Sequence, residues 1–311
     1  FVPLGQVLAR AIADHERVVR AYSVNVAGSL TGIWLFDAMS LLRLPPVIWF
    51  GGVTVVLVLL MVSVRQMNWL AVALTTVAAV LVGFGHSRTV RTVWSPYHKL
   101  TVAPSYTGSG DRPLQWGYTI GVNDTFYQHM LDLSDTFWDS HSAILDSSLL
   151  ARSHYNSPFL FRPKVQRILI VGAGAGNDVA AALRHGVKQV DCVEIDPEIY
   201  ALGKELHPER PYDSPSVRLF VNDARAFFKQ ATGPYDMIWF GLLDSHTLGS
   251  SYNNLRLDHY VYTVESLREA KRLLADDGLM VVNFAAQRPW IADRLFALLK
   301  HVFGHEPLCY A

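Results

Sequence analysis

The sequence predicts an α/β fold with a doubly wound, mainly parallel sheet, a small β lid subdomain before it, and transmembrane helices at the N-terminus. Three observations lead to this prediction. After residue 165, short apolar runs alternate with helical stretches, which is the pattern of a parallel sheet. A glycine-rich turn follows the first of these runs. Before residue 86, two segments of about 20 residues contain no charged side chain.

The glycine-rich turn lies in residues 168–196, which read as a strand, a turn, a helix and a second strand. The turn has the sequence GAGAG, and the second strand ends in Glu194, about twenty residues later. Glycines let the backbone approach a ligand closely, and a helix N-terminus favours polar or anionic groups. A carboxylate at the second strand's end can accept hydrogen bonds from ribose hydroxyls. The segment therefore predicts a site for a cofactor that contains adenosine.

The spacing of the glycines separates two classes of nucleotide fold. Gly172, Gly174 and Gly176 follow the order G-x-G-x-G, whereas a dinucleotide fingerprint would place its third glycine at position 177, which is Asn177. The observed order is similar to that of S-adenosylmethionine-dependent transferase folds, which are Rossmann-like. The alternative is an α/β domain in which the glycines only permit tight packing.

Three later apolar runs continue the predicted sheet. Residues 219–225 predict a strand that ends in Asp223, and in folds of this class an acid there accepts a hydrogen bond from the adenine amino group. Residues 235–246 predict a strand that runs into an acidic loop, and residues 279–284 predict the next strand, after a turn at residues 276–278. Ligands of such sheets bind at the carboxyl ends of the strands, so both acidic positions are expected at the site.

Composition limits the possible classes of protein. The 311 residues suffice for two domains, and a formal net charge of zero gives no general attraction to nucleic acid. A disulfide framework is not expected, because Cys192, one of two cysteines, lies in a predicted core strand. No metal site is predicted. Hydrophobic residues make up 50% of the chain, and the excess is concentrated at the N-terminus.

Residues 1–86 predict a membrane region with two to three transmembrane helices. Residues 44–64 and 66–85 are uncharged, and each has about the 20 residues needed to cross a bilayer. Residues 21–42 are a weaker third candidate, because they contain Asp37, and a carboxylate in a bilayer costs several kcal/mol (about 2.5–3.5 on insertion scales). The alternative for this third segment is a buried or interfacial helix.

We expect an integral protein of a bacterial-type inner membrane. Positively charged residues do not decide its orientation, and the catalytic part is placed in the cytoplasm because the cofactor is found there. The chain starts without methionine and stops soon after a predicted strand. We therefore expect more sequence at both ends, including further membrane helices upstream.

Residues 87–164 predict the lid subdomain and a linker, and residues 165–311 the cofactor-binding domain. Alternating apolar residues in 97–102 and 116–122 predict two strands, with a turn at residues 107–112 between them. Asn123 and Asp124 then predict the start of a helix, with residues 126, 130 and 133 on one face. Residues 134–164 are weakly helical and link the lid to the sheet.

Several motifs together resemble those of one family. Residues 124–130, DTFYQHM, resemble the pattern D-E-F-x-Y-[QH]-E-M, and residues 95–98, SPYH, resemble S-x-Y-Q. The glycine turn lies where the pattern has G-G-G-D-G, the Asp223-Ala224 pair matches D-[GA], and residues 244–247, DSHT, lie where it has D-[ST]-[ST]-D. On these residues, about 94–311 of the chain resembles the spermidine synthases, the polyamine aminopropyltransferases. Residues 21–29 resemble a stretch of membrane-fused spermidine synthase-like proteins.

The resemblance implies transfer of an aminopropyl group from decarboxylated S-adenosylmethionine to a putrescine-like amine, with release of methylthioadenosine. It also implies a homodimer, since members of this family commonly form dimers. The implied substrate-binding residues are Tyr127 and Gln128. The implied cofactor-binding residues are Gly172, Gly174, Gly176, Glu194, Asp223, Ala224 and His98.

The chain departs from the family pattern at three positions. Ala175 stands where the glycine turn has an Asp, Thr247 replaces the second Asp of the later loop, and His98 replaces a Gln. Two carboxylates that would hold cationic amine groups are therefore missing. Asp178 could replace one of them, and the alternative is a first-turn carboxylate favoured by the helix dipole.

Aminopropyl transfer requires a neutral amine. The pKa of an alkyl amine is about 10.4, so the acceptor must first lose a proton. A carboxylate that accepts the proton and holds the amine in line can do this. We predict that Asp244 is this catalytic base, because it follows an apolar strand at the cleft end of the sheet; the alternative is a helix cap. Tyr127 and Gln128 are predicted to orient the amine from the lid.

Two other functions stay open at this point. A methyltransferase that uses intact S-adenosylmethionine is favoured by the loss of the amine-binding acids. A non-catalytic nucleoside-binding module that regulates a membrane partner is the third possibility.

Overall fold

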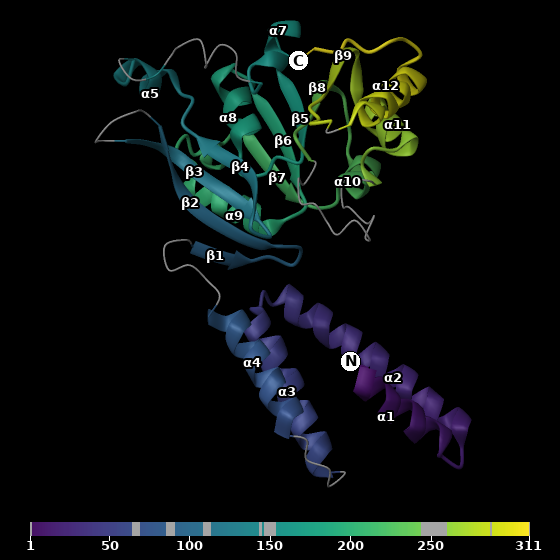
Figure 1. Cartoon of the computed structure of the whole chain (residues 1–311). Coiled ribbons are helices and arrows are strands. Elements are labelled where there is room, and N and C mark those ends of the chain that lie inside the picture. Colours follow the sequence, from purple (N-terminus) through teal and green to yellow (C-terminus); the bar gives the residue numbers. More distant parts are fainter. Residues whose placement is uncertain are drawn as a thin grey trace. The chain divides into compact units, whose positions relative to one another are not determined.

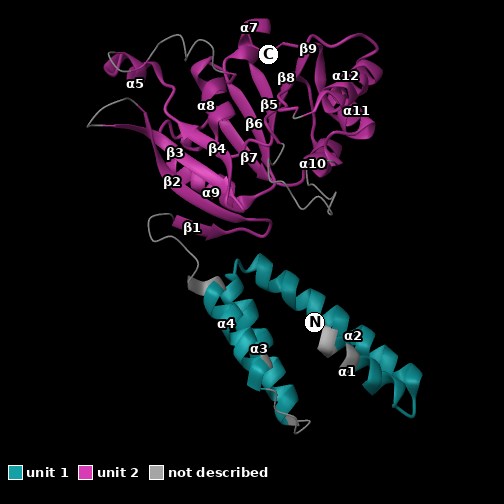
Figure 2. Cartoon of the chain, viewed as in Figure 1, with its two compact units in different colours: residues 1–87 teal, residues 88–311 magenta. Residues whose placement is uncertain are grey.

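The computed structural model describes residues 2–63, 69–84, 91–107, 113–142, 145, 154–243, 260–286 and 288–310. The chain forms two compact units, Phe1–Ser87 and Arg88–Ala311 (Figure 2), and each is described by itself. The further division of the second unit at residue 164 stays a prediction.

The first unit is helical. It contains α1 (Val2–Ala13), α2 (Val18–Leu41), α3 (Pro46–Ser63) and α4 (Trp69–Phe84). Helix α1 contacts α2, and α3 packs against α4 (Figure 1). The apolar side chains of α2 are largely exposed; Trp34, for example, is 71% exposed.

The described helices include parts of all three candidate membrane segments. Among the described residues, α2 is the one helix that is both long enough and apolar enough to cross a bilayer. Shorter apolar stretches lie in the other two candidates, at Pro46–Val62 and Val72–Leu81. The predicted segments 44–64 and 66–85 include residues outside the described ranges, so the prediction that they cross a bilayer stays a prediction.

The second unit begins with a four-stranded antiparallel sheet, which forms the lid. Its strands lie in the order β1 (Arg91–Trp94), β2 (Lys99–Thr107), β3 (Leu114–Val122) and β4 (Thr125–Leu131). Buried side chains of this sheet, such as Leu100, Ile120 and Met130, pack against Ile199 and Leu202 of a later helix. The sequence predicted β2 and β3 but missed β1 and β4.

The predicted helix after residue 123 was wrong. Asn123 and Asp124 have φ values of +50° and +64°, and they form the turn of a hairpin in which β3 pairs with β4. Positive φ at both central residues is typical of a type I′ turn, which suits the twist of a hairpin. The Asn123 side chain also accepts a hydrogen bond from the backbone N–H of Lys99 at 3.2 Å. Asn and Asp favour helix caps and left-handed turns alike, so their presence does not separate the two.

The remainder of the second unit is a doubly wound sheet with five parallel strands in the order β7-β6-β5-β8-β9. This confirms the predicted α/β fold. The strands are β5 (Arg167–Val171), β6 (Gln189–Glu194), β7 (Val217–Val221), β8 (Tyr235–Phe240) and β9 (Leu274–Val282). The helices between and beside them are α5 (Asp135–Ser140), α7 (Ser157–Phe161), α8 (Asn177–Arg184), α9 (Pro197–Leu206), α10 (Ala224–Gln230), α11 (Val264–Arg272) and α12 (Pro289–Phe303).

Two apolar layers enclose the sheet. On one face, Val179 and Ala182 of α8 pack against strand residues such as Ile170 and Trp239. On the other face, side chains of α10, α11 and α12 pack against residues such as Leu169 and Ile238. Apolar residues that point to both faces of a strand are typical of a parallel sheet covered by helices on each side.

Two strand ends differ from the prediction. Strand β7 ends at Val221, and Asp223 is the N-cap of α10. Residues 276–278, predicted as a turn before the last strand, lie within β9, where the register against β8 shifts between Tyr235 and Met237. The extra residues are accommodated as an irregularity in the pairing, which sequence periodicity does not reveal.

Candidate nucleoside-binding site

An open pocket lies at the carboxyl ends of β5, β6 and β7. The carboxyl end of a parallel sheet is where ligands of such folds bind. The lid contributes Tyr97, His98, Val122 and Tyr127 to the lining, and the sheet side contributes Gly172, Glu194, Asp196, Asp223 and Ala224, among others.

The glycine turn after β5 requires its glycines. Gly172, Gly174 and Gly176 have φ values of +71°, +54° and +108°, which residues with a side chain rarely adopt. The turn is held by a hydrogen bond from the Gly172 N–H to the Val193 carbonyl at 2.8 Å. A methyl group added at Gly174 would lie 2.9 Å from Oε1 of Gln128. The lid side chain Gln128 therefore lies directly over the turn.

Glu194 ends β6 and is held by backbone groups on both of its oxygens. Oε2 accepts a hydrogen bond from the Gly174 N–H at 2.8 Å, and Oε1 accepts one from the Asp196 N–H at 2.9 Å. The side chain is 5% exposed and lines the pocket. Burial raises the pKa of Glu194 to about 7, against the effect of these hydrogen bonds. Each carboxylate oxygen keeps a second lone pair for a ligand hydroxyl.

Asp196 is a pocket residue that the sequence reasoning missed. Its Oδ1 caps α9 by accepting hydrogen bonds from the N–H groups of Glu198 and Ile199. Its Oδ2 is buried, and no described group hydrogen-bonds to it. The Asp-Pro sequence before a helix is a signal for the cap. No signal in the sequence shows that the second oxygen lies in a pocket.

The SPYH segment forms the turn between β1 and β2. The Ser95 hydroxyl accepts hydrogen bonds from the N–H groups of Tyr97 and His98, at 3.0 and 2.8 Å. This brings His98 to the pocket, where burial lowers its pKa and the nearby charge of Asp196 acts in the opposite direction.

The structure brings most of the predicted site residues together. His98, Tyr127, Gly172, Glu194, Asp223 and Ala224 line the pocket. One oxygen of Asp223 caps α10 through the Ala226 N–H at 3.0 Å. Gly176 is the N-cap of α8 and faces Pro211 and Tyr212 instead of the pocket. Asp244 lies outside the described residues, and the roles of all these residues stay predictions.

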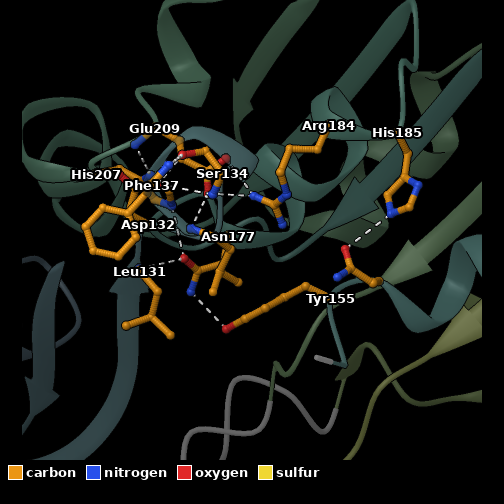
Figure 3. Close-up of polar contacts among 12 residues, drawn as sticks. Leu131, Asp132, Ser134, Phe137, Tyr155, Asn177, Arg184, His185, His207 and Glu209 are labelled. Atoms are coloured by element: carbon orange, nitrogen blue, oxygen red, sulfur yellow. Dashed lines mark hydrogen bonds and ion pairs between the residues drawn. The ribbon is translucent and has the colours of Figure 1, made fainter. Parts of the chain in front are cut away.

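A buried polar network ties the lid to the sheet domain at the start of α8 (Figure 3). The Asn177 amide donates to Tyr155 Oη at 2.8 Å and to the His129 carbonyl of β4. Its Oδ1 accepts hydrogen bonds from the Leu131 N–H and from His207 Nε2, at 3.3 and 3.0 Å. Asn177 thus joins three segments at the position where a dinucleotide fold would carry a glycine.

His207 is neutral in this network. Its Nε2 donates to Asn177, and its Nδ1 accepts a hydrogen bond from the Glu209 N–H at 3.1 Å, so a second ring proton has no acceptor. Burial, together with the charge of Arg184, lowers the pKa of His207 to about 3. Arg184 in turn pairs with Glu209 at 2.5 Å, and Glu209 accepts from the Leu133 N–H beyond β4.

We expect His207 to make folding sensitive to acid. Its ordinary pKa is 6.5 and its folded pKa about 3, so between these pH values the unfolded chain binds a proton here that the folded chain does not. Stability is therefore fully present above pH 6.5 and is lost as the pH falls, by about 2 kcal/mol between pH 7 and pH 5. Hydrogen exchange of β5 and β6 peptides in the full chain measures this loss. His207→Gln should reduce it, and an equal loss in the variant would contradict the assignment.

The fold is Rossmann-like, with the parallel sheet and glycine turn that are typical of S-adenosylmethionine-dependent transferase folds. Residues 152–305 match the family model of the spermine/spermidine synthase domain. This part of the chain belongs to the spermidine synthase family.

The relatives are named polyamine aminopropyltransferases, which are transferases. The protein from Vibrio vulnificus is 33% identical over 147 residues, which cover 47% of this chain and 46% of the relative. Polyamine aminopropyltransferase 2 from Hyperthermus butylicus is 27% identical over 168 residues, which cover 52% of each protein. The chain thus spans about half the length of these relatives. Among solved structures, spermidine synthase from Thermotoga maritima aligns with a TM-score of 0.45 and 13% identity, over 70% of this chain and 64% of that one.

Proposed function

We propose that the chain binds decarboxylated S-adenosylmethionine and transfers its aminopropyl group to a putrescine-like amine, with release of methylthioadenosine. The observation that carries this proposal is Glu194, a buried carboxylate at the end of β6 that the glycine turn itself holds through the Gly174 N–H. The names of the relatives support the aminopropyl transfer.

The polar groups of the site suit a nucleoside. In this proposal Glu194 accepts hydrogen bonds from the ribose hydroxyls, and Asp223 accepts one from the adenine amino group. Oδ2 of Asp196 and Nε2 of Gln128 are buried without a hydrogen-bond partner among the described residues. A buried polar atom of this kind costs free energy unless a ligand or water satisfies it, which supports a polar ligand here.

The reaction is a displacement at carbon. The sulfonium of the donor supplies the leaving group: the amine nitrogen bonds to the adjacent methylene carbon, the C–S bond breaks, and its electron pair stays on sulfur. The chain must remove a proton from the amine and hold the nitrogen in line. We assign the proton to Asp244 and the alignment of the amine to Tyr127 and Gln128.

The first unit is proposed to anchor the protein in a bacterial-type inner membrane, with the second unit in the cytoplasm. The length and apolar composition of α2 support the anchor. Its exposed apolar side chains suit contact with lipid. A homodimer is proposed from the family resemblance alone. We propose no nucleic-acid partner and no metal.

One experiment tests these proposals together. The protein should stay in membranes washed with carbonate, and after purification in detergent it should convert decarboxylated S-adenosylmethionine and putrescine to an aminopropylated amine, detected by mass. Asp244→Asn should abolish turnover and leave the affinity for methylthioadenosine unchanged, because it removes the base and not the nucleoside site.

The other outcomes separate the remaining functions. A methylated product from intact S-adenosylmethionine would show a methyltransferase instead. Nucleoside binding without transfer to any of several amines would indicate a regulatory module. Full turnover by Asp244→Asn would reject the assignment of the base.

A further inference from the structure

Asp178 lies at the point where the order of the sheet strands reverses. Strand β5 is followed on one side by β6 and on the other by β8, and ligands of open α/β sheets commonly bind where the strand order reverses in this way. Gly172 follows β5, Gly241 follows β8, and the Gly241 N–H donates to the Val171 carbonyl at 3.0 Å. A methyl group added at Gly241 would lie 2.6 Å from Oδ2 of Asp178 and 3.0 Å from the Gly172 carbonyl oxygen. The carboxylate of Asp178 thus occupies the space that a side chain at position 241, just after β8, would need.

This carboxylate differs from the other buried acids of the sheet. Asp191 pairs with Arg218 at 2.8 Å and accepts a hydrogen bond from Tyr235, and Glu194 accepts two backbone hydrogen bonds. Asp178 is 8% exposed, and within the described part of the chain its carboxyl has neither a hydrogen-bond donor nor a cation beside it. Burial raises the pKa of Asp178 to about 7. Burying a carboxylate without a counter-charge costs free energy, and a cationic ligand that pairs with it would remove that cost.

We propose that Asp178 receives the ammonium group of the aminopropyl chain of the donor, in place of the acids that the family pattern has and this chain lacks. This inference rests on the proposed function. Ala175 is fully buried and brings no carboxylate to the glycine turn, and Gly241 brings none from β8. The glycine turn borders both the nucleoside pocket and the Asp178 carboxylate. Gly172 lines the pocket, and its carbonyl oxygen borders the space that the Asp178 carboxylate fills.

Among the described titratable groups around Asp178, the Asp178 carboxyl is the one that changes its charge near neutral pH. Tyr155, Cys192 and Tyr212 are the neighbours whose charge interacts with it. Burial raises the pKa of each of the three, and Asp178 raises them further, so all three are uncharged at pH 7. Arg184, on the same helix, is engaged by Glu209. Among the described residues, a ligand ammonium would therefore meet one ionised partner here.

The test compares two ligands that share the nucleoside; decarboxylated S-adenosylmethionine adds the sulfonium charge and the aminopropyl chain with its ammonium. Methylthioadenosine carries no cation, whereas decarboxylated S-adenosylmethionine does, and calorimetry on the full chain in detergent gives both affinities. Asp178→Asn keeps the shape of the side chain and removes its charge. We expect it to weaken binding of decarboxylated S-adenosylmethionine by about 10-fold or more and to leave methylthioadenosine within about twofold. Unchanged methylthioadenosine binding also shows that the variant is folded.

A pH series and a second variant sharpen the test. The ratio of the two affinities should rise from pH 6 to pH 8 more steeply in the wild type than in Asp178→Asn, because Asp178 ionises in this range; Glu194 also ionises near pH 7 but is present in both proteins, so the difference between the two slopes reports Asp178. Gly241→Ala should lower the ratio without removing a charge, because its methyl group would displace the carboxylate.

Each other result counts against the proposal. Equal weakening of both ligands by Asp178→Asn would indicate a structural role, and no weakening of either would show that Asp178 does not meet the ammonium. A wild-type chain that binds neither nucleoside would overturn the proposed function and this inference with it. A chain that binds both with the same affinity would overturn the inference alone.

Discussion

Replacing Glu194 with Gln should weaken methylthioadenosine binding by about 10- to 100-fold, the range expected for loss of hydrogen bonds to a charged group. Both oxygens of Glu194 accept a backbone N–H, from Gly174 on one side and Asp196 on the other. A glutamine has one oxygen and one NH₂ group, so in either orientation the NH₂ group would face an N–H donor. The variant should therefore lose a ribose acceptor and also disturb the glycine turn.

Asp191→Asn is the matched control for this variant. Like Glu194, Asp191 is a buried acid of β6. Its partners are Arg167, Arg218 and Tyr235, and it does not line the pocket. We expect it to lower stability without changing the affinity for methylthioadenosine. Calorimetry on both variants decides the matter: if Glu194→Gln binds as tightly as the wild type, the assignment of Glu194 to the ribose is wrong.

The second large effect is expected from Gly203→Ala in α9. A methyl group there would overlap the backbone carbonyl of Ala175 in the glycine turn. Backbone atoms cannot move aside as a flexible side chain can, so the helix or the turn must shift. We expect a loss of about 1–3 kcal/mol in stability, although helix propensity alone favours alanine over glycine by about 1 kcal/mol. Nucleoside affinity should fall as well, since Gly174 belongs to the displaced turn.

Lys204→Ala provides the comparison for Gly203→Ala. Lys204 is the next residue of the same helix and is exposed, so an alanine there should change stability by less than about 0.5 kcal/mol. Hydrogen exchange of α9 and β6 peptides in the full chain measures both variants. Equal or greater protection in Gly203→Ala would show that α9 and the turn do not pack as closely as described.

The sheet could be predicted from the sequence because its signals are local. Each central strand is a continuous apolar run, and the glycine turn marks where β5 passes into α8. Such runs need no knowledge of distant residues, since a strand buried on both faces must be apolar throughout. Glu194 and Asp223 followed from the same local pattern, because they come at or just after strand ends.

The lid could be predicted only in part. Residues Asn123 and Asp124 have the side chains of a helix cap, and the choice between a helix and a hairpin depends on whether residues 125–131 find a strand to pair with. That partner is β3, and its register with β4 depends on contacts between strands of the sheet. β1 is a strand of four residues, which is too short to produce a clear periodicity.

By itself, the sequence determined the class of fold, the glycine turn and two of the acids that border the pocket, Glu194 and Asp223, because backbone conformation and strand burial depend on residues close together in the chain. Only the tertiary structure decided which polar groups meet across elements. It brought Gln128 over the glycine turn, joined Asn177 to His207, and left the carboxylate of Asp178 without a partner in the described chain, beside Gly241. These relations connect residues far apart in the sequence, and packing and desolvation act on them through space.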